Sequence, residues 1–88
     1  MISDHDRKLI SEIAARHEAG RVLVFGSSLS SDDARDIDLA VEGLPASAFF
    51  RFYGELLFAL SKPVDLIDLS VESKFTRLVR KEGVPVYG

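Results

Sequence analysis

Short β-rich runs alternate with helical segments along the whole chain, and this order constrains the fold more than any other feature. The runs cover residues 21–25, 37–41 and 64–69, and each is bounded on at least one side by glycine or proline. Apolar residues recur at helical spacing between them. The order α-β-loop-β-α-β-α predicts an α/β (α+β) fold, in which helices pack on a small mixed β-sheet of three to four strands.

Capping and breaking residues place the boundaries of these elements. The predicted helices cover about 4–18, 47–60 and 72–82, and their expected N-caps include Ser3 or Asp4 and Ser47. Residues 26–35 are small and polar, which predicts a loop with one helical turn. Residues 84–87 predict a short edge strand, because Pro85 cannot donate a hydrogen bond to a neighbouring strand.

The composition is that of a soluble globular protein with one domain, residues 1–88. A net charge of −3 argues against binding to duplex nucleic acid, which depends on a basic surface. The absence of cysteine excludes disulfides and thiolate metal sites. No signal-peptide core and no apolar stretch of about 18 residues is present, so we expect a cytoplasmic protein without a membrane segment.

Two aspartates, Asp36 and Asp38, open the second predicted strand. Side chains alternate between the faces of a strand, so we expect both carboxylates on one face and Ile37 in the core. Their Cα atoms would lie roughly 6–7 Å apart, which allows both carboxylates to converge on one ion or a close pair. Hard cations such as Mg²⁺ prefer oxygen ligands of this kind.

Topology gives this pair more weight than its spacing alone. The same spacing occurs in Asp4-His5-Asp6, where we expect the acids to oppose the helix macrodipole. A strand joined to the next through one helix normally forms a right-handed parallel crossover. We therefore expect Asp65, which begins the third strand, to lie at the same end of the sheet as Asp36 and Asp38.

Gly26 and Ser27 supply the other half of the predicted site. If the first strand is antiparallel to the second, both residues reach the end of the sheet that carries the aspartates. Glycine allows backbone N–H groups to approach an anion closely, and the serine adds a hydroxyl at the start of a helical turn. A phosphate cradle that faces three carboxylates needs metal between them, as in two-metal transfer centres with ions about 3.5–4 Å apart.

The motifs F-G-S (25–27), D-I-D-L (36–39) and V-D-L (64–66) resemble, in this order, those of the polymerase β-like nucleotidyltransferase superfamily. The size is similar to that of the minimal nucleotidyltransferases, the antitoxin partners of HEPN-domain toxins. The resemblance covers nearly the whole chain and implies the nucleotidyltransferase fold. It implies that Gly26 and Ser27 hold the triphosphate of ATP, and that Asp36 and Asp38 bind Mg²⁺. It also implies that Asp65 completes the metal site and activates the acceptor hydroxyl.

Family members transfer AMP from ATP, and the antitoxins place it on a tyrosine of a HEPN-type toxin. This chain departs from the family pattern in two ways. Only eight residues, none of them glycine, separate Ser27 from Asp36, and Arg35 stands where the family tends to have serine. The first alternative is a non-catalytic module of the same fold that neutralises its partner by occlusion. A second alternative is a freestanding enzyme that acts on a small hydroxylated substrate.

The helix predicted for residues 47–60 carries an apolar arc of roughly 160°, and we expect most of that arc to be core. Phe58 falls outside the arc, which predicts a homo- or hetero-oligomeric contact through this helix. Elsewhere, we expect Asp32 and Asp33 to be solvated loop residues and His17 to lie at the boundary of the core. Strand alternation places Asp68 on the face opposite to Asp65, outside the site.

Overall fold

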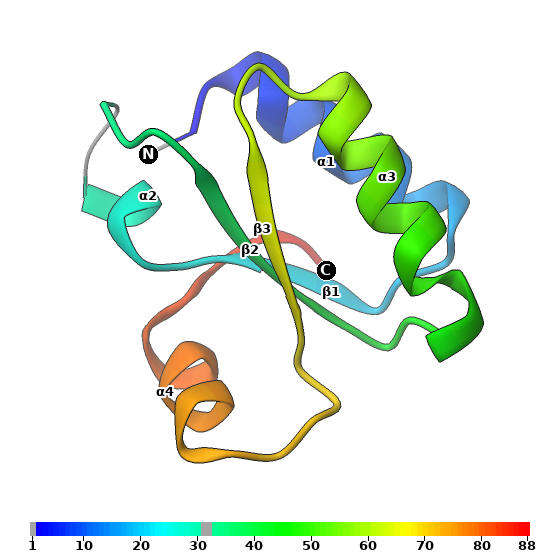
Figure 1. The fold of residues 1–88 in the computed structure, drawn as a ribbon, viewed down its shortest axis with the longest axis vertical. Helices are drawn as coiled ribbons and strands as arrows, with labels where there is room; N and C mark the ends of the chain where they lie inside the picture. The colour runs from blue at the N-terminus through cyan, green and yellow to red at the C-terminus, as the bar shows by residue number, and fades with distance from the viewer. Residues whose placement is uncertain (1, 31–32) are drawn as a thin grey trace.

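The computed structural model of the chain describes residues 2–30 and 33–88, so Asp32 lies outside the described residues. In chain order the elements are α1 (Asp4–Arg16), β1 (Arg21–Val24), α2 (Ser27–Ser30), β2 (Ile37–Glu42), the 3₁₀ turn η1 (Ala46–Ala48), α3 (Phe49–Ala59), β3 (Val64–Asp68), α4 (Lys74–Glu82) and β4 (Val84–Tyr87). Figure 1 shows α1 and α3 on one side of the sheet and α4 on the other. The predicted order of elements is therefore confirmed, including the single helical turn after β1.

The four strands form one mixed sheet in the order β3-β2-β1-β4. β2 is antiparallel to β1 and parallel to β3, as the crossover through α3 predicts. β4 pairs with β1 at the edge of the sheet, and the predicted edge position of Pro85 is confirmed. This topology brings the end of β1 and the starts of β2 and β3 to the same end of the sheet.

Strand alternation divides the core into two layers. The odd-numbered residues of β2 pack with α1 and α3 in the larger layer, whose fully buried members include Ile10, Leu39, Val41, Phe52 and Leu56. On the opposite face, Val79 of α4 packs with Leu23, Ala40 and Leu69 in a smaller layer between the sheet and that helix. Asp38 lies on this second face, because it has the same parity as Ala40.

Three predicted boundaries are wrong, for local reasons. Ser47 lies within η1, and α3 begins at Phe49 without a side-chain N-cap, so Ser47 is not the cap. α1 ends at Arg16 rather than near Glu18, because Glu18 takes a left-handed conformation with φ of 57°. α4 begins at Lys74, after Ser73 and Thr76 form a reciprocal capping box.

Most of the predicted apolar arc of α3 packs on the core, as expected, but two of its residues are exposed. Phe58 is 94% exposed, as predicted, but Phe50 is 83% exposed and Leu57 is 49% exposed. Phe52 and Leu56 are buried, and Phe49 and Tyr53 pack against the same core, so Phe50 and Leu57 are the residues of the arc that face outward. None of the helices that the structure describes has the length and hydrophobicity needed to cross a membrane.

Candidate metal and nucleotide site

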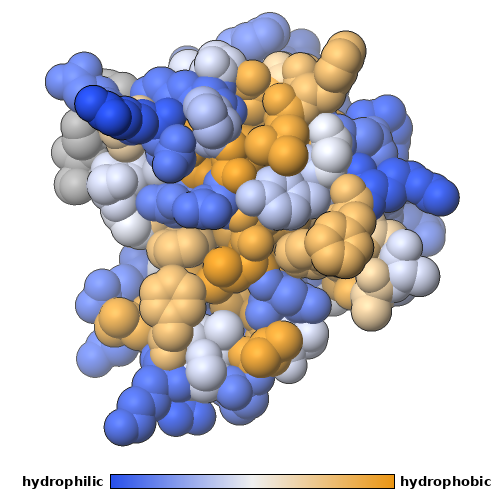
Figure 2. Space-filling model, in the orientation of Figure 1, coloured by the Kyte–Doolittle hydropathy of each residue, from blue (hydrophilic) through white to orange (hydrophobic). Residues whose placement is uncertain are grey.

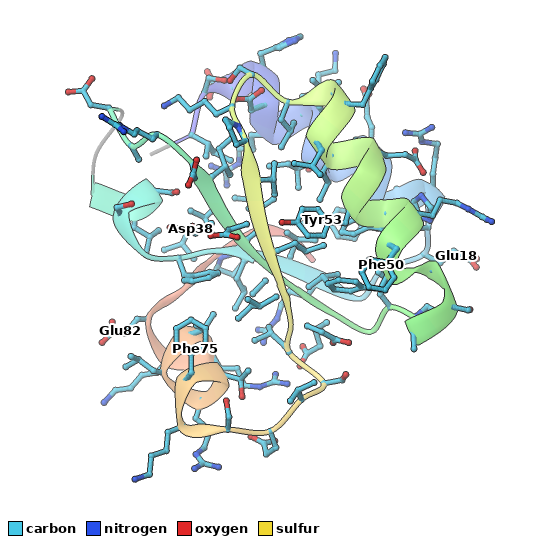
Figure 3. All side chains as sticks on the ribbon, in the orientation of Figure 1. Glu18, Asp38, Phe50, Tyr53, Phe75 and Glu82 are labelled. Atoms are coloured by element: carbon cyan, nitrogen blue, oxygen red, sulfur yellow. The ribbon has the colours of Figure 1, made fainter. Side chains whose placement is uncertain are left out.

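Asp38 and Asp65 lie side by side on neighbouring strands. The parallel register of β2 and β3 pairs Asp38 directly with Asp65, and such strands run about 4.8 Å apart. Asp38 is half-buried, whereas Asp65 is exposed on the edge strand. Figure 3 shows Asp38 between α2 and β3. The predicted placement of Asp38 and Asp65 at the same end of the sheet is therefore confirmed.

Gly26 packs directly against Asp38. Its φ is +66°, and a Cβ atom built on it would lie 2.6 Å from Asp38 Oδ2. The backbone N–H of the preceding residue, Phe25, donates to the carbonyl oxygen of Asp38 over 3.0 Å, which extends the β1–β2 ladder to this point. Glycine is needed here for both its conformation and its lack of a side chain. The turn that opens α2 thus contacts the carboxylate, and the exposed Ser27 follows it at once.

Ser28 fastens this turn to β2. Its side chain is buried, and its hydroxyl donates to the carbonyl oxygen of Asp36 and accepts from the N–H of Asp38, each over 3.0 Å. One hydroxyl therefore fixes the backbone on both sides of Ile37. Sequence analysis selected the neighbouring Ser27 and missed Ser28. The only signal was a second serine in the same turn, and its burial follows from packing rather than from sequence.

Asp36 lies in the bend before β2, not in the strand as predicted. It is exposed, while the N–H of the next residue, Ile37, donates to the carbonyl oxygen of Pro63 over 2.8 Å. Asp36 lines a pocket of about 490 Å³ together with Ser28 and Lys62. That pocket reaches the start of α1 and is not lined by Asp38 or Asp65, so Asp36 is linked to the Asp38–Asp65 pair by the effect of its charge on Asp38 and not by a shared row of the sheet.

The charges of two neighbouring carboxylates act on Asp38. Burial raises the pKa of Asp38, and the charges of Asp65 and Asp36 raise that pKa further. Within residues 2–30 and 33–88, no three acidic or histidine side chains are arranged to hold a metal ion by themselves. Mg²⁺ is commonly held by one or two carboxylates together with substrate phosphates. The Asp38–Asp65 pair fits a metal site of that shared kind, and Asp36 is near enough for its charge to act on Asp38.

Other acids singled out in the sequence have structural partners. Asp6 is buried and accepts a hydrogen bond from the N–H of Ser61 over 3.1 Å, which ties α1 to the chain before β3. Asp68 lies at the far end of β3, where its Oδ1 accepts from the N–H of Ser70 over 2.9 Å. Asp68 therefore lies outside the candidate site, whereas Asp6 lines the same pocket as Asp36 but is already bonded to Ser61. His17 ends α1 at the edge of the core, as predicted, and contacts Glu55.

Solved structures share this arrangement of elements. A toxin–antitoxin structure with AMP-PNP matches 93% of this chain and 73% of its own, with a TM-score of 0.75 and 27% identity. A candidate minimal nucleotidyltransferase matches 90% of this chain and 87% of its own, with a TM-score of 0.70 and 29% identity. The chain has the minimal nucleotidyltransferase fold.

A third structure with this nucleotidyltransferase fold comes from Shewanella oneidensis and contains a tri-AMPylated HEPN toxin in complex with an MNT antitoxin. It matches 94% of this chain and 70% of its own, with a TM-score of 0.71 and 25% identity. No protein-family model and no curated protein matches the sequence. The nucleotidyltransferase fold therefore rests on structural similarity together with the topology described above.

Proposed function

We propose that the chain is a metal-dependent nucleotidyltransferase that transfers AMP from ATP to a hydroxyl group of a HEPN-type toxin, and so acts as the antitoxin of the pair. The observation that carries the proposal is the contact of the Gly26 turn with Asp38, whose register partner is Asp65. Through this contact the backbone of the Gly26 turn, which is suited to bind phosphate, lies directly against the Asp38 carboxylate, which is suited to bind metal. Support comes from similarity to a toxin–antitoxin structure with AMP-PNP and to a complex that contains an AMPylated toxin.

In this proposal Asp36, Asp38 and Asp65 hold Mg²⁺, and the turn at Gly26 and Ser27 holds the triphosphate. The metal, when bound, supplies positive charge that offsets the phosphates and the clustered carboxylates. The close approach at Gly26 keeps the triphosphate next to Asp38. Ser28 contributes by fixing the backbone between Asp36 and Asp38, so that these two carboxylates leave the chain from a defined position.

The transfer step requires a nucleophile on the side of Asp65, which is exposed on the edge strand. The acceptor hydroxyl oxygen forms a bond to the α-phosphorus, and the bond from that phosphorus to the oxygen bridging to the β-phosphate breaks. Pyrophosphate leaves with the electron pair, and the Asp65 carboxylate takes the hydroxyl proton. General-base assistance of this kind typically contributes roughly 10²–10⁴ in rate.

Two measurements test this function. Calorimetry of the isolated chain with ATP, in the presence and absence of Mg²⁺, should show binding that depends on the metal. ATP labelled at the α-phosphate should then transfer its label to a HEPN-domain protein that copurifies with the chain. Partner binding without metal-dependent nucleotide binding would contradict the proposal and favour the occlusion module. Binding and transfer to a small hydroxylated compound, with no protein partner, would favour the freestanding enzyme.

A further inference from the structure

An aromatic residue continues the row of carboxylates on the second face of the sheet. Val24 pairs with Leu39, so the next residue, Phe25, lies opposite Asp38, and its N–H donates to the Asp38 carbonyl oxygen. Asp38 in turn pairs with Asp65. The row across β1, β2 and β3 is therefore Phe25, Asp38 and Asp65.

The next row on the same face is entirely apolar. It consists of Leu23, Ala40 and Ile67, which follow from the same registers two residues along each strand. Leu23 and Ala40 are buried, whereas Ile67 is half-buried. The carboxylate pair therefore has an apolar surface directly beside it, on the side that faces α4.

Phe75 from α4 extends this apolar surface outward. Its ring meets the ring of Phe25 edge to face, with centroids 5.8 Å apart, and Phe75 remains 52% exposed. Figure 3 shows Phe75 rising from α4 on the same side of the sheet as Asp38. In Figure 2 apolar surface runs from α4 towards the middle of the molecule, where it meets polar side chains. A large, half-exposed aromatic ring thus contacts Phe25, which lies in the row of the carboxylates.

We propose that Phe75, supported from behind by Phe25, is the nucleobase subsite of this domain, and that the base of the bound nucleoside triphosphate stacks on the exposed side of the Phe75 ring. This inference rests on the proposed function, because it needs a triphosphate at the Gly26 turn. A planar base is the group that such a ring receives well, since aromatic stacking on a base is favourable and tolerant of base identity.

The geometry of the transfer step favours the nucleobase, and not the acceptor, as the group that stacks on the Phe75 ring. Entering and leaving oxygens lie roughly in line at a reacting phosphorus. With pyrophosphate on the side of Gly26 and the acceptor on the side of Asp65, that line runs across the strands. The nucleoside then points away from it, along the strands, and in the direction of α4 the exposed ring is Phe75, because Phe25 is half-buried behind it.

Stacking without hydrogen bonds to the base also predicts which nucleotides the subsite prefers. A phenyl ring donates no hydrogen bond to a base edge, so the subsite distinguishes bases by the area of their π-face. We expect ATP and GTP to bind with similar affinity and both to bind more tightly than CTP or UTP. The subsite thereby selects a purine nucleotide but not adenine over guanine.

The test compares ATP with inorganic tripolyphosphate, which lacks the base, in the presence of Mg²⁺. Phe75→Leu should weaken ATP binding by about 5- to 150-fold, which is the range for loss of one stacked base. Its affinity for tripolyphosphate should be unchanged, which also shows that the variant is folded with an intact phosphate site. Phe75→Tyr retains the ring and should bind ATP like the wild type. ATP, but not tripolyphosphate, should shift the ring protons of Phe75 in NMR spectra.

Each outcome bears on one of the two proposals. Wild-type affinity for ATP in Phe75→Leu would overturn the nucleobase subsite and leave the proposed function in place. The same holds if that variant binds ATP normally but loses its protein partner, because Phe75 would then belong to a docking surface. Equal losses for ATP and tripolyphosphate would make Phe75 a structural residue and would also overturn the subsite. A wild-type domain that binds neither ligand would overturn both proposals.

Discussion

Gly26 and Asp38 are packed so closely that a methyl group on the glycine would lie 2.6 Å from the carboxylate oxygen Oδ2. The contact joins the turn that follows β1 to the start of β2. It fixes the position of the carboxylate relative to the turn that is proposed to hold phosphate. Any side chain at residue 26 must displace one of the two halves of the site.

Gly26→Ala should therefore lower the melting temperature and abolish Mg²⁺-dependent ATP binding. The left-handed conformation alone costs a non-glycine residue roughly 1–2 kcal/mol, and the clash with Asp38 adds to that cost. Gly54→Ala in α3 is the matched control, because a Cβ at Gly54 meets nothing within 4 Å. That substitution should stabilise the helix by about 0.5–1 kcal/mol and leave ATP binding unchanged. Normal ATP binding by Gly26→Ala would contradict the importance of the contact.

Asp38→Asn should raise the free energy of unfolding of the metal-free domain at neutral pH. The pKa of Asp38 is raised in the folded state, so folding favours its protonated form. That contribution is fully present below the ordinary pKa near 3.8 and is lost as pH rises through the folded-state pKa. The advantage of the asparagine variant should thus shrink as the medium is acidified, which denaturant unfolding at several pH values can measure. A large loss of stability at neutral pH would make Asp38 a structural residue.

Asp65→Ala should reduce transfer more than nucleotide binding. Asp65 is exposed on the edge strand, where an acceptor can reach it, and general-base assistance is worth roughly 10²–10⁴ in rate. Single-turnover transfer and ATP affinity should be measured on the same preparation. Equal losses in both would assign Asp65 to metal binding alone. Asp68→Ala provides the comparison, because Asp68 lies at the far end of β3 and should affect neither quantity.

Ser28→Ala should destabilise the domain, whereas Ser27→Ala should mainly weaken ATP binding. Removal of the Ser28 hydroxyl leaves the N–H of Asp38 without its partner, and such an unpaired buried group costs about 1–3 kcal/mol. Ser27 is exposed, and its proposed role is contact with the triphosphate. Thermal unfolding and calorimetry of the two variants separate these effects. The opposite pattern would exchange the roles of the two serines.

Phe58→Ala should weaken partner binding or self-association with little change in melting temperature. Phe58 and Phe50 lie on the outer side of α3, away from the buried line of Phe52 and Leu56, and Figure 2 shows apolar side chains over this helix. Truncation of an aromatic anchor typically costs ~2 kcal/mol or more of binding. Phe52→Ala is the control, because loss of a buried phenylalanine costs about 3–5 kcal/mol of stability. A drop in melting temperature for Phe58→Ala would assign it to the core.

The parts of the site that were predictable follow from strand periodicity and chain topology. Alternation put Asp38 opposite to the core-facing Ile37, and the crossover through α3 brought Asp65 to the same end. The role of Ser28 was not predictable, because it depends on which hydroxyl of the turn becomes buried against β2. Phe75 was missed for the same reason, since only the packing of α4 brings it to Phe25. The exposure of Phe50 depends on the orientation of α3, which helical periodicity does not set.

The proposed phosphate turn and Asp38 come from one segment of the chain, whereas Asp65 comes from a more distant one. Gly26, Ser28 and Asp38 belong to one continuous segment that closes on itself through the Ser28 hydroxyl. Asp65 reaches this segment only through pairing of β3, an edge strand that pairs with β2 alone and whose Val64 carbonyl oxygen accepts a hydrogen bond from the Tyr53 hydroxyl. Amide hydrogen exchange should therefore be faster in β3 than in β2, because edge strands open more readily by local fluctuation. Such an opening would remove the proposed base while the phosphate turn stays folded, so catalytic competence can vary independently of nucleotide occupancy.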